Sequence, residues 1–481
     1  GDGSMTGGMA YEALNNVAEL QSGMIIVLND NNMSISENVG GFSKYLNNIR
    51  TKQSYVDFKD DLENALKKIP GIGETMIRRL KQSKDSIKHR LLPSGFFEDL
   101  GINYLGPIDG HDIHQLIRAI LVAKRSKEPI VLHVITKKGK GYAPAEKSPS
   151  RFHGVGRFDV ASGEMKDHTA PGQTYTEVFS MAMVRMAQKN PKITAITAAM
   201  PDGTGLTRFS RQFPSRFFDV GIAEAHAVTF AAGLAAAGLK PYVAVYSSFL
   251  QRAYDQSGHD VCIQSLPVTF CIDRAGLVGA DGETHQGILD LSYMNTIPNM
   301  AVFAPKNKYE FYDVLRFSEH FDGPLAIRYP RGEAYEGLKE FRAPIVPGKS
   351  EVLLKGSGIA VIAVGSMVET AMDAGKLLEE EGICATVVNA RFVKPLDTQL
   401  LSQLSSSHRL VVTMEENVLN GGYGQSVAAY YAGCCGNMPR VLPVGIPDIF
   451  VEHGNVAVLK KELSLDGPSV AKRILEAWRQ L

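Results

Sequence analysis

The sequence lacks an apolar run of about 18 residues, the length that crosses a bilayer, and it shows no signal-peptide pattern. Its five cysteines include no CxxC pair, so they predict neither a zinc site nor a dithiol centre, and they fit a reducing compartment. Its 51 basic and 51 acidic residues cancel, so no overall field favours nucleic acid or an anionic membrane. These absences predict a soluble cytoplasmic protein with no nucleic-acid or membrane partner, in which phosphate recognition is local.

The sequence also lacks an initiator methionine, and no strand precedes the glycine turn at Gly1, although such turns normally follow one. We therefore expect an upstream segment before residue 1. The 481 residues predict about three domains. Alternating strand and helix patterns place them at 1–165, 174–336 and 357–481, and this alternation predicts α/β domains with mainly parallel sheets.

Hydrophobic periodicity locates the expected elements. The first domain has expected helices at 5–20 and 113–123, strands at 24–28, 100–105 and 130–135, and a weak helical pattern at 58–69 and 76–87. The second has expected strands at 193–197, 217–220, 242–245, 268–272, 300–304 and 325–329, and helices at 177–188, 223–237, 249–263 and 309–319. The third has expected strands at 359–364, 385–389 and 410–413, and helices at 368–380, 398–404 and 424–432. It shows no catalytic constellation, so we expect it to serve in dimerisation.

One oxygen-rich turn precedes the first expected helix, and a second follows the first expected strand. Asp2 offers a carboxylate, and Asn31 and the Met33 backbone carbonyl offer neutral oxygens, the ligands that magnesium-type ions prefer. One helix and one strand separate the two turns, the length of a parallel crossover, so both reach the same carboxyl edge of a sheet. A lone GDG is most often an ordinary turn, but paired with NDN it predicts a metal-diphosphate site.

A basic glycine loop, residues 137–142, follows the expected strand at 130–135. By itself such a loop is simply solvated, but its place near the two oxygen-rich turns favours contact with phosphate or cofactor. Residues 150–173, dotted with glycine and proline, are expected to form a linker, and this linker contains His153.

Glu224 lies where a strand meets an almost wholly apolar helix. A glutamate near a helix start is commonly a cap. A helix this apolar is not expected on the surface, however, so the carboxylate requires a buried partner. We therefore predict that Glu224 belongs to a functional site.

Polar groups also follow several expected strands of the second domain: Tyr246, Arg252, Arg274, Asp281, His285 and Arg331. The carboxyl ends of parallel strands meet at one edge of a sheet, so we expect these groups to gather there. A single arginine in such a place usually forms a surface ion pair. Several in a neutral protein predict a phosphate site, because guanidinium binds phosphate oxygens bidentately.

The following segments together carry a resemblance to a known family: GDGSMTGGMAYEALN, NDNNMSISENVGG, GPIDGHD, KKGKGYAPAE, FHGVGRFD, FDVGIAEAHAVTFAAGLA, YSSFLQRAYDQ, DRAGLVGADGETHQG, RYPRG, RFVKPLD and TMEENVLNGGYG. Along essentially the whole chain they resemble the 1-deoxy-D-xylulose-5-phosphate synthase family. The GDG to NDN pattern resembles the thiamine diphosphate motif of the transketolase superfamily. No short motif is sufficient alone.

The resemblance implies three α/β domains with a transketolase-like fold, a homodimer, and Mg²⁺ and thiamine diphosphate bound between the first and second domains. It also implies a transferase that decarboxylates pyruvate and passes the two-carbon unit to D-glyceraldehyde 3-phosphate. That product begins the methylerythritol phosphate route to isoprenoids and also feeds thiamine synthesis.

The resemblance further implies roles for single residues. Asp2, Asn31 and the Met33 carbonyl would bind the metal, Gly3, Ser4, Asn31 and Tyr142 would contact the cofactor, and Glu224 would activate it. Tyr246, Arg252, Arg274 and Arg331 would bind the substrate phosphate, and His153, Asp281 and His285 would move protons and orient the acceptor hydroxyls.

The chain departs from the family pattern in two ways. The family has a further amino-terminal portion that meets the cofactor, and this portion is absent here. Ala225 stands where the family usually has a polar residue, a change that we expect to alter packing rather than mechanism. Two alternatives stay open: another superfamily enzyme, such as a transketolase or a pyruvate dehydrogenase component, or an inactive truncated remnant.

Overall fold

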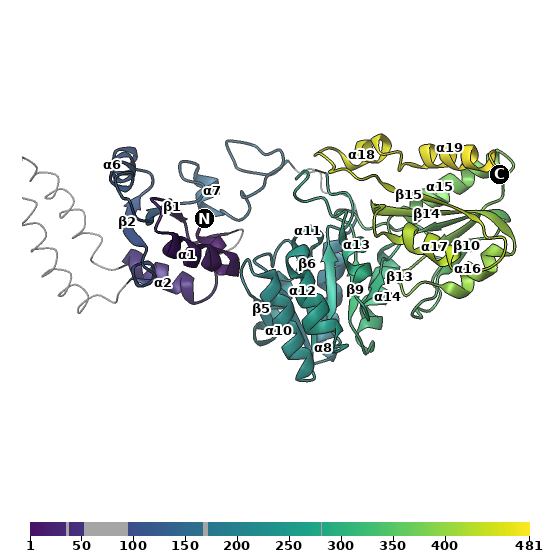
Figure 1. Cartoon of the computed structure of the whole chain (residues 1–481), viewed down its shortest axis with the longest axis horizontal. Helices are drawn as coiled ribbons and strands as arrows, with labels where there is room; N and C mark the ends of the chain where they lie inside the picture. Colours follow the sequence, from purple (N-terminus) through teal and green to yellow (C-terminus); the bar gives the residue numbers. More distant parts are fainter. Residues whose placement is uncertain (35–37, 52–94, 167–171, 280) are drawn as a thin grey trace, which may run out of the picture. The chain divides into compact units, whose positions relative to one another are not determined.

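The computed structural model describes residues 1–34, 38–51, 95–166, 172–279 and 281–481 (Figure 1). The chain divides into two compact units. Unit 1 is Gly1–His168 with Gly221–Ala223, and unit 2 is Thr169–Val220 with Glu224–Leu481. Both units are α/β. No helix in these described ranges combines the length and apolar character needed to cross a membrane.

Unit 1 is built on a three-stranded parallel sheet in the order β1-β3-β2. Its strands are β1 (Ile25–Asp30), β2 (Asn103–Asp109) and β3 (Ile130–Ile135). The central strand β3 is buried along nearly its whole length, as expected of a parallel strand with a neighbour on each side. The strand expected at 24–28 forms β1, which begins at Ile25, and the strand expected at 100–105 begins later, at Asn103.

Helices cover both faces of this sheet. On one face, Ala119 of α6 (Ile113–Ala123) packs with Leu132 of β3. On the other, Leu14 of α1 (Gly8–Leu20) packs with Val131, because successive side chains of a strand point to opposite faces. Further helices of unit 1 are η1 (Asp2–Thr6), α2 (Gly41–Thr51), α5 (Phe96–Asp99) and α7 (Ala143–Lys147). The helical patterns expected at 58–69 and 76–87 lie outside the described residues.

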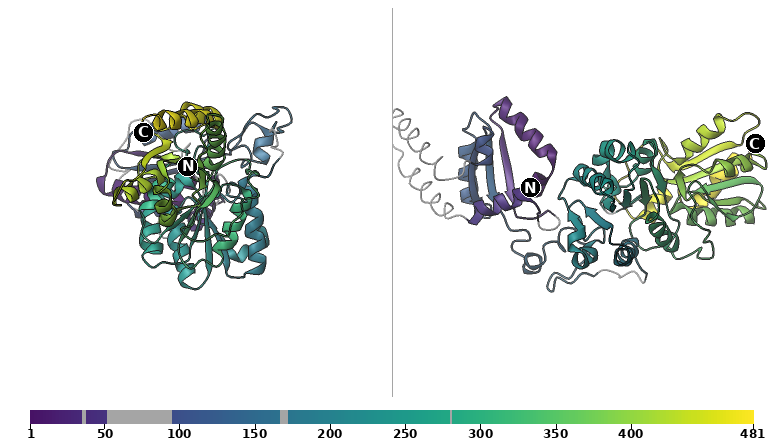
Figure 2. Two further views of the ribbon diagram at one scale, coloured as in Figure 1. Left: turned by 90° about the vertical axis from the view of Figure 1, so that its right-hand side faces the viewer. Right: turned by 90° about the horizontal axis from the view of Figure 1, so that it is seen from below.

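The larger sheet of unit 2 has seven strands in the order β13-β8-β9-β7-β6-β4-β5. They are β4 (Ile193–Thr197), β5 (Phe217–Asp219), β6 (Lys240–Tyr246), β7 (Thr269–Asp273), β8 (Ala301–Phe303), β9 (Leu325–Arg328) and β13 (Phe392–Lys394). Its helices include α8 (Tyr175–Lys189), α9 (Thr207–Gln212), α10 (Glu224–Ala236), α13 (Asp290–Thr296) and α14 (Lys308–Ser318). Figure 2 shows helices on both sides of the strands, the arrangement expected of a parallel sheet.

The single helix expected at 249–263 is wrong. This stretch forms four short pieces instead: α11 (Ser247–Leu250), η3 (Gln251–Ala253), α12 (Tyr254–Gln256) and the π-helical η4 (Ser257–Cys262). The buried Ser257 hydroxyl donates to the Ala253 carbonyl over 2.8 Å. Such a bond within a helix competes with the regular backbone pattern, and hydrophobic periodicity does not reveal it.

The smaller sheet of unit 2 has five strands in the order β10-β12-β11-β14-β15, parallel except for β10. They are β10 (Glu351–Leu354), β11 (Gly358–Ala363), β12 (Thr386–Asn389), β14 (His408–Val418) and β15 (Arg440–Ile446). Its helices are α15 (Met367–Glu380), α16 (Thr398–Ser405), α17 (Tyr423–Ala432), α18 (Val456–Glu462) and α19 (Gly467–Trp478). In Figure 1, α15 and α19 lie on one side of these strands, and α16 and α17 lie on the other.

The periodicity analysis did not predict β10, β13 or β15. Strand β13 pairs antiparallel with β8, so a segment from the predicted third domain completes the sheet of the second. The mainly parallel α/β class is confirmed. The division at 1–165, 174–336 and 357–481 stays a prediction.

Candidate active site

In unit 1, the two oxygen-rich turns meet. Asp2 begins η1, and only 3% of its surface is exposed. The backbone amides of Asn31 and Asn32 hydrogen-bond to its carboxylate, and the Asn38 side chain donates to Oδ2 over 2.8 Å. The Asn31 Oδ1 accepts from the Met33 amide over 3.0 Å and so closes the turn after β1. The structure therefore brings Asp2 and the Asn31 turn together.

Asp30, which the sequence analysis did not single out, places a second acid beside Asp2. The pKa of Asp2 is raised to about 6, first by burial and then by the carboxyl group of Asp30, which hydrogen-bonds to it. The amides of Asn31 and Asn32 act in the opposite direction. A divalent cation beside two such acids favours their ionised forms, so this donor set fits a magnesium-type ion.

A buried chain of polar groups lies behind Asp30. His133 Nε2 is 2.9 Å from Asp30 Oδ2, and the Tyr104 hydroxyl is 2.6 Å from His133 Nδ1. These residues come from β1, β3 and β2, so the chain crosses the whole sheet in its spatial order. It fixes the position of Asp30 and, through it, of the acid pair.

The glycine beside Asp2 is required by close packing. Gly3 is buried, and a Cβ there would lie 2.8 Å from the Ser34 Cβ. Ser4, the next predicted cofactor contact, is exposed, and its amide donates to the Gly1 carbonyl over 3.1 Å. A larger residue at position 3 would displace the turn that carries Ser34, so the close packing of these two segments requires glycine.

The basic loop brings Lys138 to His153. Lys138 Nζ lies 2.8 Å from His153 Nδ1 and also donates to the Ser34 carbonyl. Burial lowers the pKa of Lys138, and Asp2 partly opposes this change. Burial and then the charge of Lys138 lower the pKa of His153. The predicted proton-transfer residue His153 thus lies beside Lys138, which the sequence analysis placed in the basic glycine loop without giving it a separate role.

Tyr142, a predicted cofactor contact, packs within its own loop. Its hydroxyl donates to the Val160 carbonyl over 2.8 Å, and its ring meets Phe152 edge to face, with 5.6 Å between centroids. It is also the N-cap residue of α7. Contact with the cofactor stays a prediction for this residue.

In unit 2, Glu224 is the first residue of α10 and is 5% exposed. Arg252 Nη1 lies 3.4 Å from its Oε2. Burial raises the pKa of Glu224, while its own backbone amide and Arg252 act in the opposite direction. The carboxylate therefore has the buried setting expected for it. The helix itself is not wholly buried, since His226 and Thr229 are exposed.

Tyr246 and Arg274 form a packed pair at the ends of β6 and β7. The Arg274 guanidinium lies 4.0 Å from the Tyr246 ring centroid, and its Nη1 donates to Asp273 Oδ2 over 2.8 Å and to the Gly203 carbonyl over 2.7 Å. Arg274 has a positive φ of 58°. Its side chain is 19% exposed, and a guanidinium is a good partner for phosphate oxygens.

Arg331, Asp281 and His285 lie near that pair. Arg331 Nη1 is 3.4 Å from Asp281 Oδ2, and the His285 ring contacts Phe249, with 5.2 Å between centroids. Phe249 in turn stacks on Tyr246 at 5.5 Å. The structure thus gathers five of the predicted residues of unit 2 in one neighbourhood, while Arg252 contacts Glu224.

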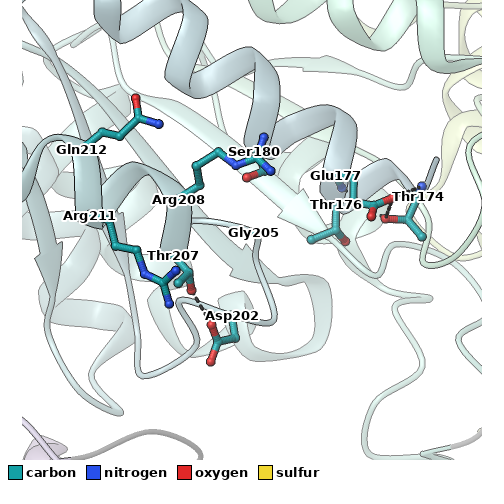
Figure 3. Close-up of a pocket in the computed structure, with 10 residues that line it drawn as sticks. All are labelled: Thr174, Thr176, Glu177, Ser180, Asp202, Gly205, Thr207, Arg208, Arg211 and Gln212. Carbon is teal, nitrogen blue, oxygen red and sulfur yellow. Dashed lines mark hydrogen bonds between the residues drawn. The ribbon is translucent and has the colours of Figure 1, made fainter. Parts of the chain in front are cut away.

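A surface pocket of unit 2 adjoins this neighbourhood (Figure 3). Arg208 extends toward Ser180 in the close-up, and Arg211 extends toward the Thr207 hydroxyl, which donates to Asp202. None of the predicted site residues lines the pocket. Thr176, which does line it, donates to Asp273 over 3.2 Å, so the pocket lies behind the carboxylate that holds Arg274.

Three family models match consecutive stretches of the chain. Residues 1–136 match the 1-deoxy-D-xylulose-5-phosphate synthase model, residues 172–336 match the transketolase pyrimidine binding domain, and residues 348–470 match the transketolase C-terminal domain. Glu224 and the gathered residues of unit 2 lie in the second stretch. Asp2 and Asn31 lie in the first.

Curated relatives match almost the whole chain. A 1-deoxy-D-xylulose-5-phosphate synthase of Lachnoclostridium phytofermentans is 55% identical, over 98% of this chain and 76% of the relative. One of Caldanaerobacter subterraneus subsp. tengcongensis is 50% identical, over 100% of this chain and 77% of the relative. The chain therefore spans about three quarters of the length of these relatives.

Solved structures agree with the fold. A split gene transketolase, an inactive β4 tetramer, is 31% identical over 64% of this chain and 99% of its own, with a TM-score of 0.56. A transketolase of Campylobacter jejuni is 17% identical over 98% of this chain and 76% of its own, with a TM-score of 0.54. From the identities and the family models together, the chain belongs to the 1-deoxy-D-xylulose-5-phosphate synthase family of transketolase-like, thiamine diphosphate-dependent transferases.

Proposed function

We propose that the protein condenses pyruvate with D-glyceraldehyde 3-phosphate, releasing CO₂ and forming 1-deoxy-D-xylulose 5-phosphate, the first step of the methylerythritol phosphate route to isoprenoids. The strongest support is the 55% identity to a synthase of that name over 98% of the chain. The reaction needs a site for a cation and diphosphate, a group that handles a proton, and a site for a phosphorylated aldehyde. The two units contain suitable side chains for each.

Asp2, Asn31 and the Met33 carbonyl would hold Mg²⁺, and Gly3, Ser4 and Tyr142 would contact the cofactor. The pair of acids Asp2 and Asp30 supports this assignment, because a cation offsets the raised pKa of Asp2. Thiamine diphosphate supplies the electron sink for the carbanion left when pyruvate loses CO₂. The chain's part is to bind this group, orient it and exclude water.

Glu224 would hold or accept a proton at the cofactor. Its burial and raised pKa favour the protonated form more than an exposed glutamate does, and Arg252 keeps the ionised form accessible. Burial and Arg252 thus act in opposite directions on the pKa of one carboxyl group, a setting suited to general acid-base work.

Arg274, Tyr246 and Arg331 would bind the phosphate of the aldehyde, with Arg252 nearby. Arg274 supports this role most directly, because Asp273 and the Gly203 carbonyl fix one nitrogen and leave other guanidinium N–H groups for a ligand. Asp281, His285 and His153 would orient the acceptor hydroxyls and move protons.

We also propose a cytoplasmic homodimer with domains at 1–165, 174–336 and 357–481 and with no nucleic-acid or membrane partner. A neutral net charge is consistent with the absence of an electrostatic partner. Sedimentation of the intact-length protein tests the dimer, with a monomer as the contradicting result.

The experiment for the reaction combines pyruvate, D-glyceraldehyde 3-phosphate, Mg²⁺ and thiamine diphosphate with the intact-length protein. We expect CO₂ release and 1-deoxy-D-xylulose 5-phosphate, and neither without the cofactor. Transfer from a ketose phosphate instead of pyruvate would indicate a transketolase. Calorimetry separates the inactive alternative, because binding of thiamine diphosphate by this chain at a Kd of about 1 μM or tighter rules it out.

A further inference from the structure

The loop formed by residues 276–279 and 281–287, here called the acceptor loop, follows β7 and carries Asp281 and His285. Its two ends are tied together, because Gly276 and Gly287 exchange backbone hydrogen bonds of 2.6 and 2.8 Å. Bonds at its base alone leave the rest of a loop free to move. Further contacts therefore decide where Asp281 and His285 are presented.

These contacts come from the C-terminal part of unit 2, residues 351–481. The Leu277 amide donates to Oε1 of Glu416 over 2.8 Å. Glu416 lies on β14, is 1% exposed, and is itself held by the Ser366 hydroxyl at 2.7 Å and by Lys460 at 3.3 Å. The loop is thus bonded to a carboxylate whose own position is fixed.

A second connection passes through Gln286. Its Oε1 accepts from the amides of Val278 and Gly279 at 2.8 and 3.3 Å, and its Nε2 donates to the Glu452 carbonyl over 3.0 Å. Gln286 is 3% exposed, so its three hydrogen bonds are shielded from water. One amide side chain therefore organises the loop and joins it to the segment before α18.

The backbones also meet directly. The Gly454 amide donates to the Gly279 carbonyl over 3.1 Å. Gly279 has a φ of 81°, and a Cβ there would lie 2.5 Å from the Gly454 carbonyl oxygen. Leu277 and Ile288 are buried in the core cluster of the C-terminal part with Val361. Polar and apolar contacts thus attach the same loop to the same part of the chain.

From this geometry we propose that the C-terminal part positions the acceptor loop, with Glu416 and Gln286 as positioning residues for binding of the phosphorylated aldehyde. The inference rests on the proposed function, which places Asp281 and His285 at the acceptor. It gives the C-terminal part a role in substrate binding in addition to the dimerisation expected from the sequence.

The test uses Gln286→Met in the intact-length holoenzyme. Methionine keeps the length of the side chain but removes all three hydrogen bonds. We expect the KM for D-glyceraldehyde 3-phosphate to rise about tenfold, while the KM for pyruvate and the Kd for thiamine diphosphate change less than about twofold. Deuterium exchange of the Leu277, Val278 and Gly279 amides should become faster.

Thr386→Val is the matched control. Thr386 is 5% exposed, lies in the same part of the chain, and bonds to the Gly356 amide at 3.0 Å and to His408 at 2.8 Å, away from the acceptor loop. It should leave the aldehyde KM and the loop exchange unchanged. Equal KM and exchange changes in Gln286→Met and Thr386→Val would overturn the proposal.

Glu416→Gln is a second variant. It retains an acceptor for the Leu277 amide but loses the charge that faces Lys460, so we expect a smaller rise in the same KM and faster exchange at Leu277. If the wild-type protein makes no product, the proposed function is wrong. The exchange measurements still test whether Gln286 and Glu416 hold the acceptor loop in place. An active wild type with unchanged loop exchange in both variants would reject the positioning role alone.

Discussion

Both units contain buried carboxylates, but their neighbours carry opposite charges. In unit 1, burial and the Asp30 carboxyl raise the pKa of Asp2 to about 6. In unit 2, burial also raises the pKa of Asp273 to about 6, but Arg274, 2.8 Å away, acts against this rise. Glu224 follows the second pattern, since burial raises its pKa and Arg252 opposes the change.

The difference indicates what each unit is suited to bind. Two acids side by side gain from a cation, because its charge offsets both their burial and their mutual repulsion. A guanidinium that is already held by a carboxylate has its remaining N–H groups fixed in direction, which suits an anion. We therefore propose the cation site at the acid pair of unit 1 and the anion site at Arg274 of unit 2, although both lie beside a carboxyl group with a pKa raised to about 6.

The largest effect is expected at Glu224. Glu224→Gln removes the titratable group and nearly preserves the shape, so turnover should fall on the order of a thousandfold while cofactor binding persists. Steady-state kinetics and calorimetry on the holoenzyme measure both. Glu177→Gln is the control, because Glu177 also lies in the first turn of a helix but serves a capping box, a role that glutamine can fill. Near-normal turnover in Glu224→Gln would refute the assignment.

The acid pair of unit 1 should govern metal affinity. Asp2→Asn should weaken Mg²⁺ binding on the order of a hundredfold, and Asp30→Asn, which acts through Asp2, by about tenfold. Calorimetric titration with Mg²⁺ in the presence of thiamine diphosphate provides the comparison. Asp112→Asn should change nothing, because asparagine also caps α6. An Asp30→Asn variant with wild-type affinity would show that the buried chain behind it does not position the metal ligand.

Asp273 should make stability depend on pH. Its folded pKa of about 6 exceeds the unfolded value of 3.8, so the folded state binds the proton more tightly. The resulting stabilisation is complete below about pH 4 and is lost as pH rises through 6, about 3 kcal/mol at most. Denaturant unfolding at several pH values measures this slope. Asp273→Asn should reduce this slope without removing it, because Asp2 also has a pKa raised to about 6, and an unchanged slope would exclude Asp273 as a contributor.

A smaller change is expected from Arg274→Lys. Lysine keeps the charge but loses the planar stacking and the paired N–H groups, so the KM for the aldehyde phosphate should rise about tenfold. Arg216→Lys is a close control, because Arg216 also lies over a ring, Phe213, at 4.3 Å and donates to backbone carbonyls. If both variants behave alike, Arg274 has only a packing role.

Much of the fold could be predicted from periodicity. Buried strands such as β4 and β9 are short, mainly apolar runs between helices, and their bounds fall within a residue or two of the expected ones. Each of the misses has a specific structural cause. Strand β13 has three residues and exists through its pairing with β8, and Ser257 breaks the regular pattern of its helix with a side-chain bond.

Residues of the candidate site also differ in whether the sequence alone could reveal them. Asp2, Asn31 and Glu224 belong to local patterns of turn, strand and helix, which a sequence displays. Asp30, His133 and Tyr104 act through contacts between strands that are distant in sequence, and the same holds for Gln286 with Glu452. Asp30 was visible in the NDN turn, but only its contact with Asp2 distinguishes it from its asparagine neighbours.

The central claim is that unit 1 binds the metal and diphosphate while Arg274 of unit 2 binds the aldehyde phosphate. The most direct test measures two quantities, the Kd for Mg²⁺ with thiamine diphosphate and the KM for D-glyceraldehyde 3-phosphate, in both Asp2→Asn and Arg274→Lys. We expect Asp2→Asn to raise the Kd and Arg274→Lys to raise the KM with the Kd unchanged. A Kd that rises in Arg274→Lys as much as in Asp2→Asn would contradict the claim.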